Sequence, residues 1–343
     1  MKVYLLPNTA ATNQIFTVAG NQSIVWDYIA NSLVKTLPDT PLQSRTFPSS
    51  ATSVLLPLVA PNYEPSILIC GGSSGDIPNP TALSDCYTIC PNDPSPTYEP
   101  TDSLPNGPQT MSDGILLPDG TVLLINGAHS GCGGGFMADD PVLSPVIYNA
   151  SAPFGQRFTT MPSTTIPRLY HSTAILLASG EVLVSGSNPA VGYSATGMVG
   201  PGWPSFGNNG HTCALQQQQK KTSVYPTEYR VEIFSPPYMD ALARPVITSS
   251  PHDMAYNSSF TICATLNGQP LRGETMVVLS TPGFHTHGQG MGQRMAMLGQ
   301  DIGKAGMIVT APRDASVMPP GQYLLFVTKN GIPSEGIWVE VGA

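Results

Sequence analysis

Apolar residues in this chain occur in short runs separated by turn-forming residues. Typical segments read LLPDGTVLLINGA from Leu116 and LLASGEVLVSGS from Leu176, in which an Asp-Gly or Ser-Gly turn joins two apolar runs. Runs of about four to eight residues bounded by Gly, Pro, Asn, Asp or Ser are typical of β-strands. No long segment has the 3.6-residue apolar period of a helix. The pattern therefore predicts an all-β protein.

A related unit recurs along the first two thirds of the chain. It starts at Leu5, Leu55, Leu116 and Leu176, at intervals of 50, 61 and 60 residues. A period near 50, with glycine after an apolar strand, is typical of the blades of a kelch-type β-propeller. We therefore predict a propeller portion over residues 1–243, which at roughly 50 residues per blade holds about four to five blades. Either the ring is small, or it is incomplete and its N-terminal blades are missing. A β-sandwich with fortuitous internal similarity is the alternative.

The pattern changes near Arg244. Residues 244–343 contain strand-like segments such as SFTICATLN, TMVVLST and QYLLFVTKNGIPS at turn-punctuated spacing, which predicts an immunoglobulin-like β-sandwich. The segment 190–223 is a long glycine-rich insertion between two predicted blade strands. Loops of this length are usually functional or disordered.

Charge and hydropathy exclude two classes of partner. The 343 residues include 14 basic and 22 acidic side chains, for a net charge of −8, and the basic residues are scattered. A nucleic-acid partner is therefore not expected. No apolar run approaches the roughly 20 residues that cross a bilayer, so we predict no membrane span.

Other features indicate the secretory route. Glycosylation sequons occur at Asn21, Asn149 and Asn257. The first residues, MKVYLLPNTAATNQIFTVAG, lack the apolar core of a signal peptide. We therefore expect a secreted protein whose natural beginning precedes this sequence.

The six cysteines are an even number, which is compatible with several disulfide pairings. Cys132 and Cys213 lie near glycine-rich loops, and a bond between them would pin the long insertion. Cys86 and Cys90 could pair across a short loop. Cys263 falls in a predicted core strand of the second domain.

Two motifs contain side chains that bind metals. PRLYHSTAILL, from Pro167, has Tyr170 and His171 next to each other just before a strand. In a regular strand adjacent side chains point to opposite faces. Both could address one centre only if the backbone bends there.

The second motif is GFHTHGQGMGQR, with His285 and His287 two residues apart. In a strand these two imidazoles would share a face. No cysteine or acidic residue lies beside them, which disfavours a zinc site. Their partners must come from elsewhere in the chain.

Four segments in one order give a family resemblance over essentially the whole chain. They are RLYHSTAILL with the following GSNP, PTEYRVEIFSPPYM, GFHTHGQGMGQRM and VMPPGQYLLFVTKNGIPSEGIWVEVG. The chain resembles the copper radical oxidases of the galactose oxidase and glyoxal oxidase type, and is more similar to the glyoxal oxidase branch. The resemblance implies a propeller followed by an early-set immunoglobulin-like domain, a hairpin of which carries a copper ligand to the propeller axis.

The resemblance also implies the roles of three residues. Tyr170 resembles the axial tyrosine that binds copper and acts as the base, and His171 resembles the first imidazole ligand. His287 matches the second imidazole ligand, whereas His285 matches no ligand and is expected near the substrate. Nitrogen and oxygen donors suit Cu(II). The implied reaction oxidises small aldehydes or primary alcohols with O2 and releases H2O2.

The other half of the family's site has no match in this sequence. The family has a second tyrosine, in an RWYP-like motif, that is cross-linked to a cysteine and carries a radical. No cysteine here has a matching context, nor does Tyr4, Tyr28 or Tyr63. The chain alone is therefore expected to bind copper through three ligands without the radical and to be inactive. The alternative is a non-catalytic propeller module that binds glycan or protein.

Three histidines remain outside this assignment. His129 and His211 lie on glycine-rich loops that could surround the same opening, and His252 is expected in solvent. Neither the substrate nor the oligomeric state follows from the sequence.

Overall fold

The computed structural model of this protein describes residues 1–7, 13–74, 80–135, 137–189, 193, 225–303 and 306–342. Within these ranges the regular elements are strands, apart from one 3-10 turn, η1, at Pro237–Asp240. The predicted all-β class is confirmed. The insertion at 190–223 lies almost wholly outside the described residues.

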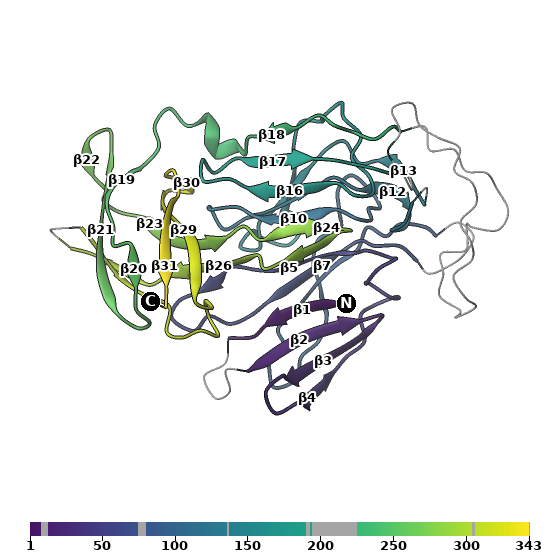
Figure 1. Cartoon of the computed structure of the whole chain (residues 1–343), viewed down its shortest axis with the longest axis horizontal. Helices are drawn as coiled ribbons and strands as arrows, with labels where there is room; N and C mark the ends of the chain where they lie inside the picture. Colours follow the sequence, from purple (N-terminus) through teal and green to yellow (C-terminus); the bar gives the residue numbers. More distant parts are fainter. Residues whose placement is uncertain are drawn as a thin grey trace.

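Four small antiparallel sheets form the first part of the chain (Figure 1). In each sheet the strands lie side by side in chain order, as in a propeller blade. The first two blades are β1 (Lys2–Leu5), β2 (Gln14–Ala19), β3 (Gln22–Asp27) and β4 (Ser32–Leu37), then β5 (Thr52–Leu55), β7 (Ile67–Cys70), β8 (Cys86–Ile89) and β9 (Glu99–Pro100). The next two are β10 (Asp113–Leu116), β11 (Val122–Ile125), β14 (Val146–Tyr148) and β15 (Phe158–Thr160), then β16 (Thr173–Leu176), β17 (Val182–Ser185) and β18 (Glu232–Phe234). A separate two-stranded sheet joins β12 (Ala128–Gly131) to β13 (Ala138–Pro141).

The sequence repeat corresponds to the turn between the first two strands of each blade. In the third blade the Leu117 amide donates to the Thr121 carbonyl at 2.9 Å, and in the fourth the Leu177 amide donates to the Glu181 carbonyl at 2.8 Å. The equivalent glycine in each turn has a positive φ, which a residue with a Cβ would adopt only with strain. The described part of the chain holds four blade sheets, within the predicted number of four to five.

The second part of the chain is a sandwich of two sheets. One sheet contains β19 (Val246–Ser249), β21 (Ser259–Leu266), β28 (Met307–Thr310) and β27 (Gln300–Ile302), with β22 (Gln269–Pro270) on β21. The other contains β20 (Asp253–Met254), β31 (Ile337–Val341), β29 (Gly321–Lys329), β23 (Thr275–Thr281) and β26 (Arg294–Leu298), with β30 (Ile332–Pro333) on β29. The hairpin β24 (Phe284–Thr286) and β25 (Gln289–Met291) leaves the second sheet between β23 and β26.

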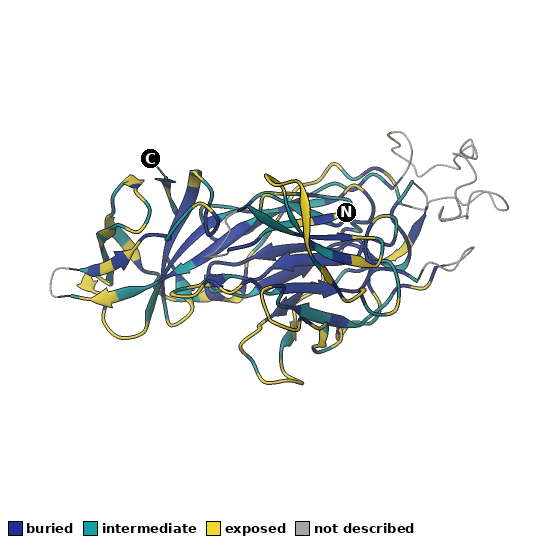
Figure 2. Cartoon of the chain, turned by 90° about the horizontal axis from the view of Figure 1, so that it is seen from below, coloured by how far each residue is buried: buried dark blue, intermediate teal, exposed yellow. Residues whose placement is uncertain are grey.

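One strand from the propeller completes a sandwich sheet. β6 (Leu58–Val59) comes from the connection between the first two strands of the second blade, and it pairs in parallel with β26. Leu58 is fully buried and packs in one cluster with sandwich residues such as Leu279 and Ala296. Figure 2 shows buried residues running through both parts of the chain. The hydrophobic core therefore passes across the junction.

Three arginines hold the two parts together through backbone carbonyls. Arg244 donates to Ser179 O at 2.7 Å in the fourth blade and to Ser334 O at 2.9 Å in the sandwich. Arg294, which is 6% exposed, donates to Leu5 O at 3.0 Å in the first blade. Each bond gives a backbone carbonyl a charged donor, so the guanidinium groups tie the two parts to each other.

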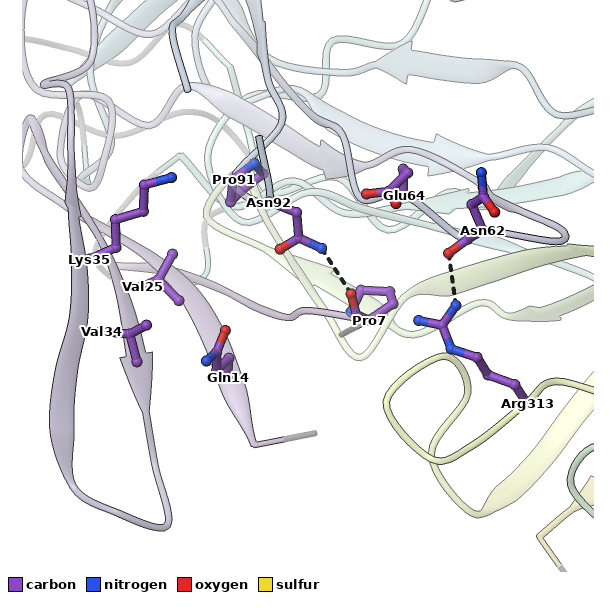
Figure 3. A pocket seen from close by; sticks show the side chains of 10 residues that line it. All are labelled: Pro7, Gln14, Val25, Val34, Lys35, Asn62, Glu64, Pro91, Asn92 and Arg313. Carbon is purple, nitrogen blue, oxygen red and sulfur yellow. Dashed lines mark hydrogen bonds between the residues drawn. The ribbon is translucent and has the colours of Figure 1, made fainter. Parts of the chain in front are cut away.

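The third arginine lies at a cleft where the first two blades meet the sandwich. Figure 3 shows this cleft, in which Arg313 donates to Asn62 O at 2.8 Å and Asn92 donates to Pro7 O at 2.9 Å. The Arg313 guanidinium also lies 5.6 Å from the centre of the Tyr63 ring. Polar contacts therefore join the first two blades to each other and to the sandwich at this cleft.

The disulfide pattern differs from the prediction. Cys70 bonds to Cys86, not Cys86 to Cys90, because Cys70 and Cys86 face each other across the β7–β8 ladder with Cα atoms 4.1 Å apart. Cys90 is a free thiol one residue beyond β8. Cys132 is disulfide-bonded, and its predicted partner Cys213 lies outside the described residues.

We expect the Cys70–Cys86 bond to stabilise the second blade measurably. It closes a segment of 16 residues, and cross-links of this length contribute about 3 kcal/mol by restricting the unfolded chain. Replacing both cysteines with alanine should lower the free energy of unfolding in urea by about that amount. Cys90→Ala is the matched control and should change it by less than about 1 kcal/mol. Equal losses in the two variants would contradict the prediction.

Candidate metal centre

The turn before β16 presents Tyr170 and His171 together. Neither residue is in a strand, and His171 has a φ of 63°. This left-handed conformation turns the chain so that the two adjacent rings lie with centroids 3.9 Å apart. The bend that the sequence required for a common centre is therefore present.

Buried polar contacts hold this turn in place. Arg168 is 1% exposed, forms an ion pair with Glu232 at 2.7 Å and donates to Arg230 O at 3.1 Å, so the start of the turn is tied to the last strand of the blade. Gly186 lies against the turn from β17, where a Cβ would come within 2.5 Å of His171 O. Only glycine allows this approach, so the position of His171 depends on it.

The β24–β25 hairpin separates the two histidines of GFHTHGQGMGQR. His285 is on β24, is 4% exposed, and donates from Nε2 to Gly114 O at 3.1 Å. His287 lies beyond the strand, in the turn, with a φ of 56°. The strand geometry that would have placed both imidazoles on one face ends at Thr286, so the two rings enter different environments.

His287 meets the Tyr170–His171 pair across the junction of the two parts. Its ring centroid lies 5.0 Å from that of Tyr170 and 4.9 Å from that of His171. Both contacts are edge-to-face, with interplanar angles of 73° and 88°. Three residues that the sequence singled out, from two separate motifs, thus lie in one cluster.

Hydrogen bonds leave one nitrogen of each imidazole available. His171 Nδ1 donates to Asn188 O at 3.0 Å, and His287 Nδ1 lies 2.7 Å from Thr286 Oγ1. A metal-binding imidazole commonly donates through one nitrogen and binds with the other. Both rings can therefore offer Nε2, and Tyr170 adds a phenol oxygen.

The cluster is half open to solvent. Tyr170 is 9% exposed and burial raises its pKa. Burial lowers the pKa of His287, and the nearby His171 lowers it further. Both shifts favour neutral side chains in the free protein, and a neutral imidazole is the form that binds a metal.

The other histidines do not join this cluster. His129 lies on β12 and bonds to Pro108 O at 2.6 Å, and His252 is exposed beside Asp253. His211 is outside the described residues. Within the described residues no group of three His, Cys, Asp or Glu side chains could hold a metal, so the structure gives a zinc site at His285 and His287 no support.

Sequence reasoning gave no role to several residues around the cluster. The backbone carbonyl of Asn188 accepts from His171 Nδ1, and the backbone amide of Asn188 donates to Tyr170 O at 2.9 Å. Its place in GSNP was part of the family resemblance and was the available signal. Phe47 lies edge-on to His287 with centroids 6.1 Å apart, and nothing in its local sequence indicates this position.

Comparison with family models decides the relationship. The model described as "Glyoxal oxidase N-terminus" matches residues 2–202, more than half of the chain. The chain belongs to the glyoxal oxidase family. A second model, "Galactose oxidase-like, Early set domain", matches residues 244–341.

Individual relatives of this glyoxal oxidase family member agree with that assignment. The chain is 36% identical over 95% of its length to Aldehyde oxidase GLOX1 of Arabidopsis thaliana, of which it covers 53%. It is 34% identical over 99% of its length to Aldehyde oxidase GLOX of Vitis pseudoreticulata, of which it covers 61%. The chain therefore spans little more than half the length of these relatives.

A solved structure shares the fold. It is described as a novel fungal alcohol oxidase with catalytic diversity among the AA5 family, in complex with copper. The TM-score is 0.74, with 18% identity, over 99% of this chain and 63% of that one. This match supports a propeller portion followed by an early-set sandwich. No helix in the described ranges is long and apolar enough to cross a membrane.

The burial of His285 predicts a pH effect on stability. Burial lowers its pKa from 6.5 to about 4, so below pH 6.5 the unfolded chain takes up a proton before the folded chain does. Stability from this group is complete above pH 6.5 and is lost as the pH falls toward 4, at up to about 1.4 kcal/mol per pH unit. The free energy of unfolding, measured in urea at several pH values between 4 and 6.5, should fall less steeply with decreasing pH in His285→Gln than in the parent.

The exposed His252 offers the matched control. His252→Gln makes the same replacement, and its free energy of unfolding should depend on pH as that of the parent does. The same pH dependence in His285→Gln as in the parent would mean that the fold does not hold His285 neutral.

Proposed function

We propose that Tyr170, His171 and His287 bind one copper ion and that the chain is the ligand-bearing portion of a copper radical oxidase. The observation that carries the proposal is the cluster of these three rings, with centroids 3.9 to 5.0 Å apart. Its donors are two imidazole nitrogens and one phenol oxygen. That donor set suits Cu(II) and lacks the thiolates and carboxylates of a typical structural zinc or calcium site.

The residues fit the ion without rearranging their hydrogen bonds. The Nδ1 contacts to Asn188 and Thr286 orient the imidazoles and leave Nε2 for the metal. Copper, when bound, would exchange single electrons and lower the pKa of groups that it binds. Tyr170 is the residue that this would affect most, because burial raises its pKa above the ordinary value of a phenol.

Tyr170 is proposed as the base as well as a residue that would bind the copper ion. Once deprotonated, its phenolate oxygen can accept the proton of a substrate hydroxyl bound beside it. His171 and His287 act as ligands only. The Nδ1 atom of His171 stays bonded to Asn188 O, and that of His287 to Thr286 Oγ1. Phe47 lies edge-on to His287 and contacts that ring on one side.

The proposed overall reaction oxidises a small aldehyde or a primary alcohol. The reacting form is the alcohol, or the hydrate that an aldehyde forms with water; it loses two electrons and two protons, and O2 takes them up to give H2O2. Two of the relatives are named aldehyde oxidases and the solved structure an alcohol oxidase, which supports the substrate class. No nucleic-acid partner is proposed.

The radical partner is not proposed within this chain. The family's cross-linked cysteine and tyrosine have no counterpart among the six cysteines of this sequence or among Tyr4, Tyr28 and Tyr63. We therefore propose that residues 1–343 alone bind copper without forming the radical and have no oxidase activity. The alternative function is a non-catalytic module that binds glycan or protein.

The location and the domain division belong to the same proposal. A buried disulfide between Cys70 and Cys86 supports an oxidising, extracellular location. We propose a propeller portion at 1–243 and an early-set domain at 244–343. In support, every strand from β19 onward belongs to the sandwich or to its hairpin.

Copper titration of the purified chain tests the ligand set. The parent should bind one Cu(II), and Tyr170→Phe and His287→Ala should each weaken binding at least about tenfold, which is about 1.4 kcal/mol. His252→Ala removes an exposed imidazole on the sandwich and is the control that should bind as the parent does. Unchanged affinity in both ligand variants would refute the site.

The visible absorption spectrum of the copper-loaded chain tests whether residues 1–343 form a radical. We expect the weak d–d bands of Cu(II) and no intense visible absorption after treatment with an oxidant such as ferricyanide. An intense visible band that appears only after the oxidant is added would contradict this expectation and show that this chain forms a radical by itself.

A further inference from the structure

The turn that carries His287 has an unusual backbone. Strands β24 and β25 are joined by only two residues, His287 and Gly288, with φ values of 56° and 68°. Two successive positive φ values are typical of a type I′ hairpin turn, in which Asn or Gly is preferred. A histidine in the first position is strained, so the surroundings must hold it there.

The turn is seated on the backbone of two neighbouring blades. A Cβ on Gly288 would lie 3.0 Å from Met111 Cα and 3.4 Å from Ser50 O. Met111 and Ser50 are themselves joined by a 2.8 Å hydrogen bond from the Met111 amide to the Ser50 carbonyl. The seat is therefore rigid, and it contacts the turn closely.

Lys2, on β1 of the first blade, makes hydrogen bonds to this turn and to the segment before β5. Its Nζ donates to Gly288 O at 3.0 Å and to Ala51 O at 2.7 Å. One ammonium group thus joins the first blade, the second blade and the turn. The bond to Gly288 fixes the carbonyl next to the His287–Gly288 peptide, which limits rotation of that peptide.

Such a placement is costly for a lysine. Lys2 is only 4% exposed, and a buried ammonium needs compensation by hydrogen bonds or opposite charge. Asp113, on β10 and 1% exposed, is near enough to act on Lys2 electrostatically, although the two form no ion pair within 4.0 Å. Asp113 also accepts from Asn126 at 2.9 Å. The three residues form a buried polar group at the base of the turn.

We propose that Lys2 is a positioning residue that holds the His287 imidazole in metal-binding geometry through its bond to the Gly288 carbonyl. This inference rests on the proposed copper function of Tyr170, His171 and His287. Lys2 does not touch the metal or the substrate, and it acts through the backbone of the turn. Its contribution is specific because a hydrophobic residue of the same length would fill the space without the hydrogen bonds.

The test compares Lys2→Met with Lys35→Met. Lys35 is on β4 of the same blade and donates to Asp93 O at 2.7 Å at the surface, so it offers the same chemical change away from the turn. In Lys2→Met we expect about tenfold weaker Cu(II) affinity and a changed parallel hyperfine splitting in the Cu(II) EPR spectrum. Lys35→Met should keep the parent values. The parent EPR spectrum and affinity in Lys2→Met would overturn the inference.

Hydrogen exchange supplies a readout that needs no metal. Peptides covering 284–291 should exchange faster in Lys2→Met, while peptides of β23 at 275–281 should exchange as in the parent. Unchanged exchange in the hairpin overturns the positioning role even if the copper proposal fails. If His287→Ala leaves copper affinity unchanged while the hairpin exchanges faster in Lys2→Met, the copper assignment fails and the seating role of Lys2 stands.

A second variant guards against loss of folding. Lys2→Met leaves Asp113 buried without its positive neighbour, so Lys2→Met combined with Asp113→Asn removes both charges. The double variant should regain stability while its hairpin still exchanges faster than in the parent. Return of the hairpin to parent exchange in the double variant would assign the effect to the orphaned carboxyl and overturn the role of Lys2.

Discussion

Insertion of the β24–β25 hairpin between the first strands of the blades is the interaction on which the rest of the structure depends. The first strand of each blade has no partner strand on its inner side, so its N–H and C=O groups need other partners. His285 of the hairpin, and Gln293 just after it, supply them for β10. Gln293 Oε1 accepts from the Leu116 amide at 3.0 Å, and Gly114 O accepts from Gln293 at 2.9 Å and from His285 at 3.1 Å. On the opposite side, Thr173 of β16 donates to the His285 carbonyl at 2.9 Å.

The candidate ligands share a backbone feature that follows from this arrangement. His171 and His287 both have left-handed φ values, although neither is glycine or asparagine. Each lies in a turn that the surrounding structure fixes, His171 by Gly186 and Asn188, and His287 by Met111 and Lys2. Strain of this kind is typical of functional sites because the imidazoles are oriented before a ligand arrives. The residues that support the two imidazoles come from several blades and from the hairpin, so the position of each ring depends on how these parts pack together.

The sequence predicted the fold class and the repeat because both depend on local patterns. Two apolar runs joined by a turn recur along the chain, and in the third and fourth blades the structure places this turn at Leu117 and Leu177. Tyr170, His171 and His287 were found through motif order. The strand rule alone placed His285 and His287 on one face, and it fails because β24 ends at Thr286; only the family resemblance gave the two histidines different roles. The Cys70–Cys86 bond and the Lys2–Gly288 contact depend on strand pairing and on residues 286 positions apart, which no local pattern encodes.

The pairing of β6 with β26 has a consequence for how the protein is made. Leu58 and Val59 leave the ribosome long before Ala296 and Met297, and at about 5–20 residues per second the delay is on the order of ten seconds or more. During that time the second blade presents an apolar loop whose partner strand does not yet exist. The contacts between β6 and the sandwich are therefore completed only after β26 has been synthesised. The second blade cannot bury Leu58 fully by folding with its neighbouring blades alone, because the residues that cover Leu58 belong to the sandwich.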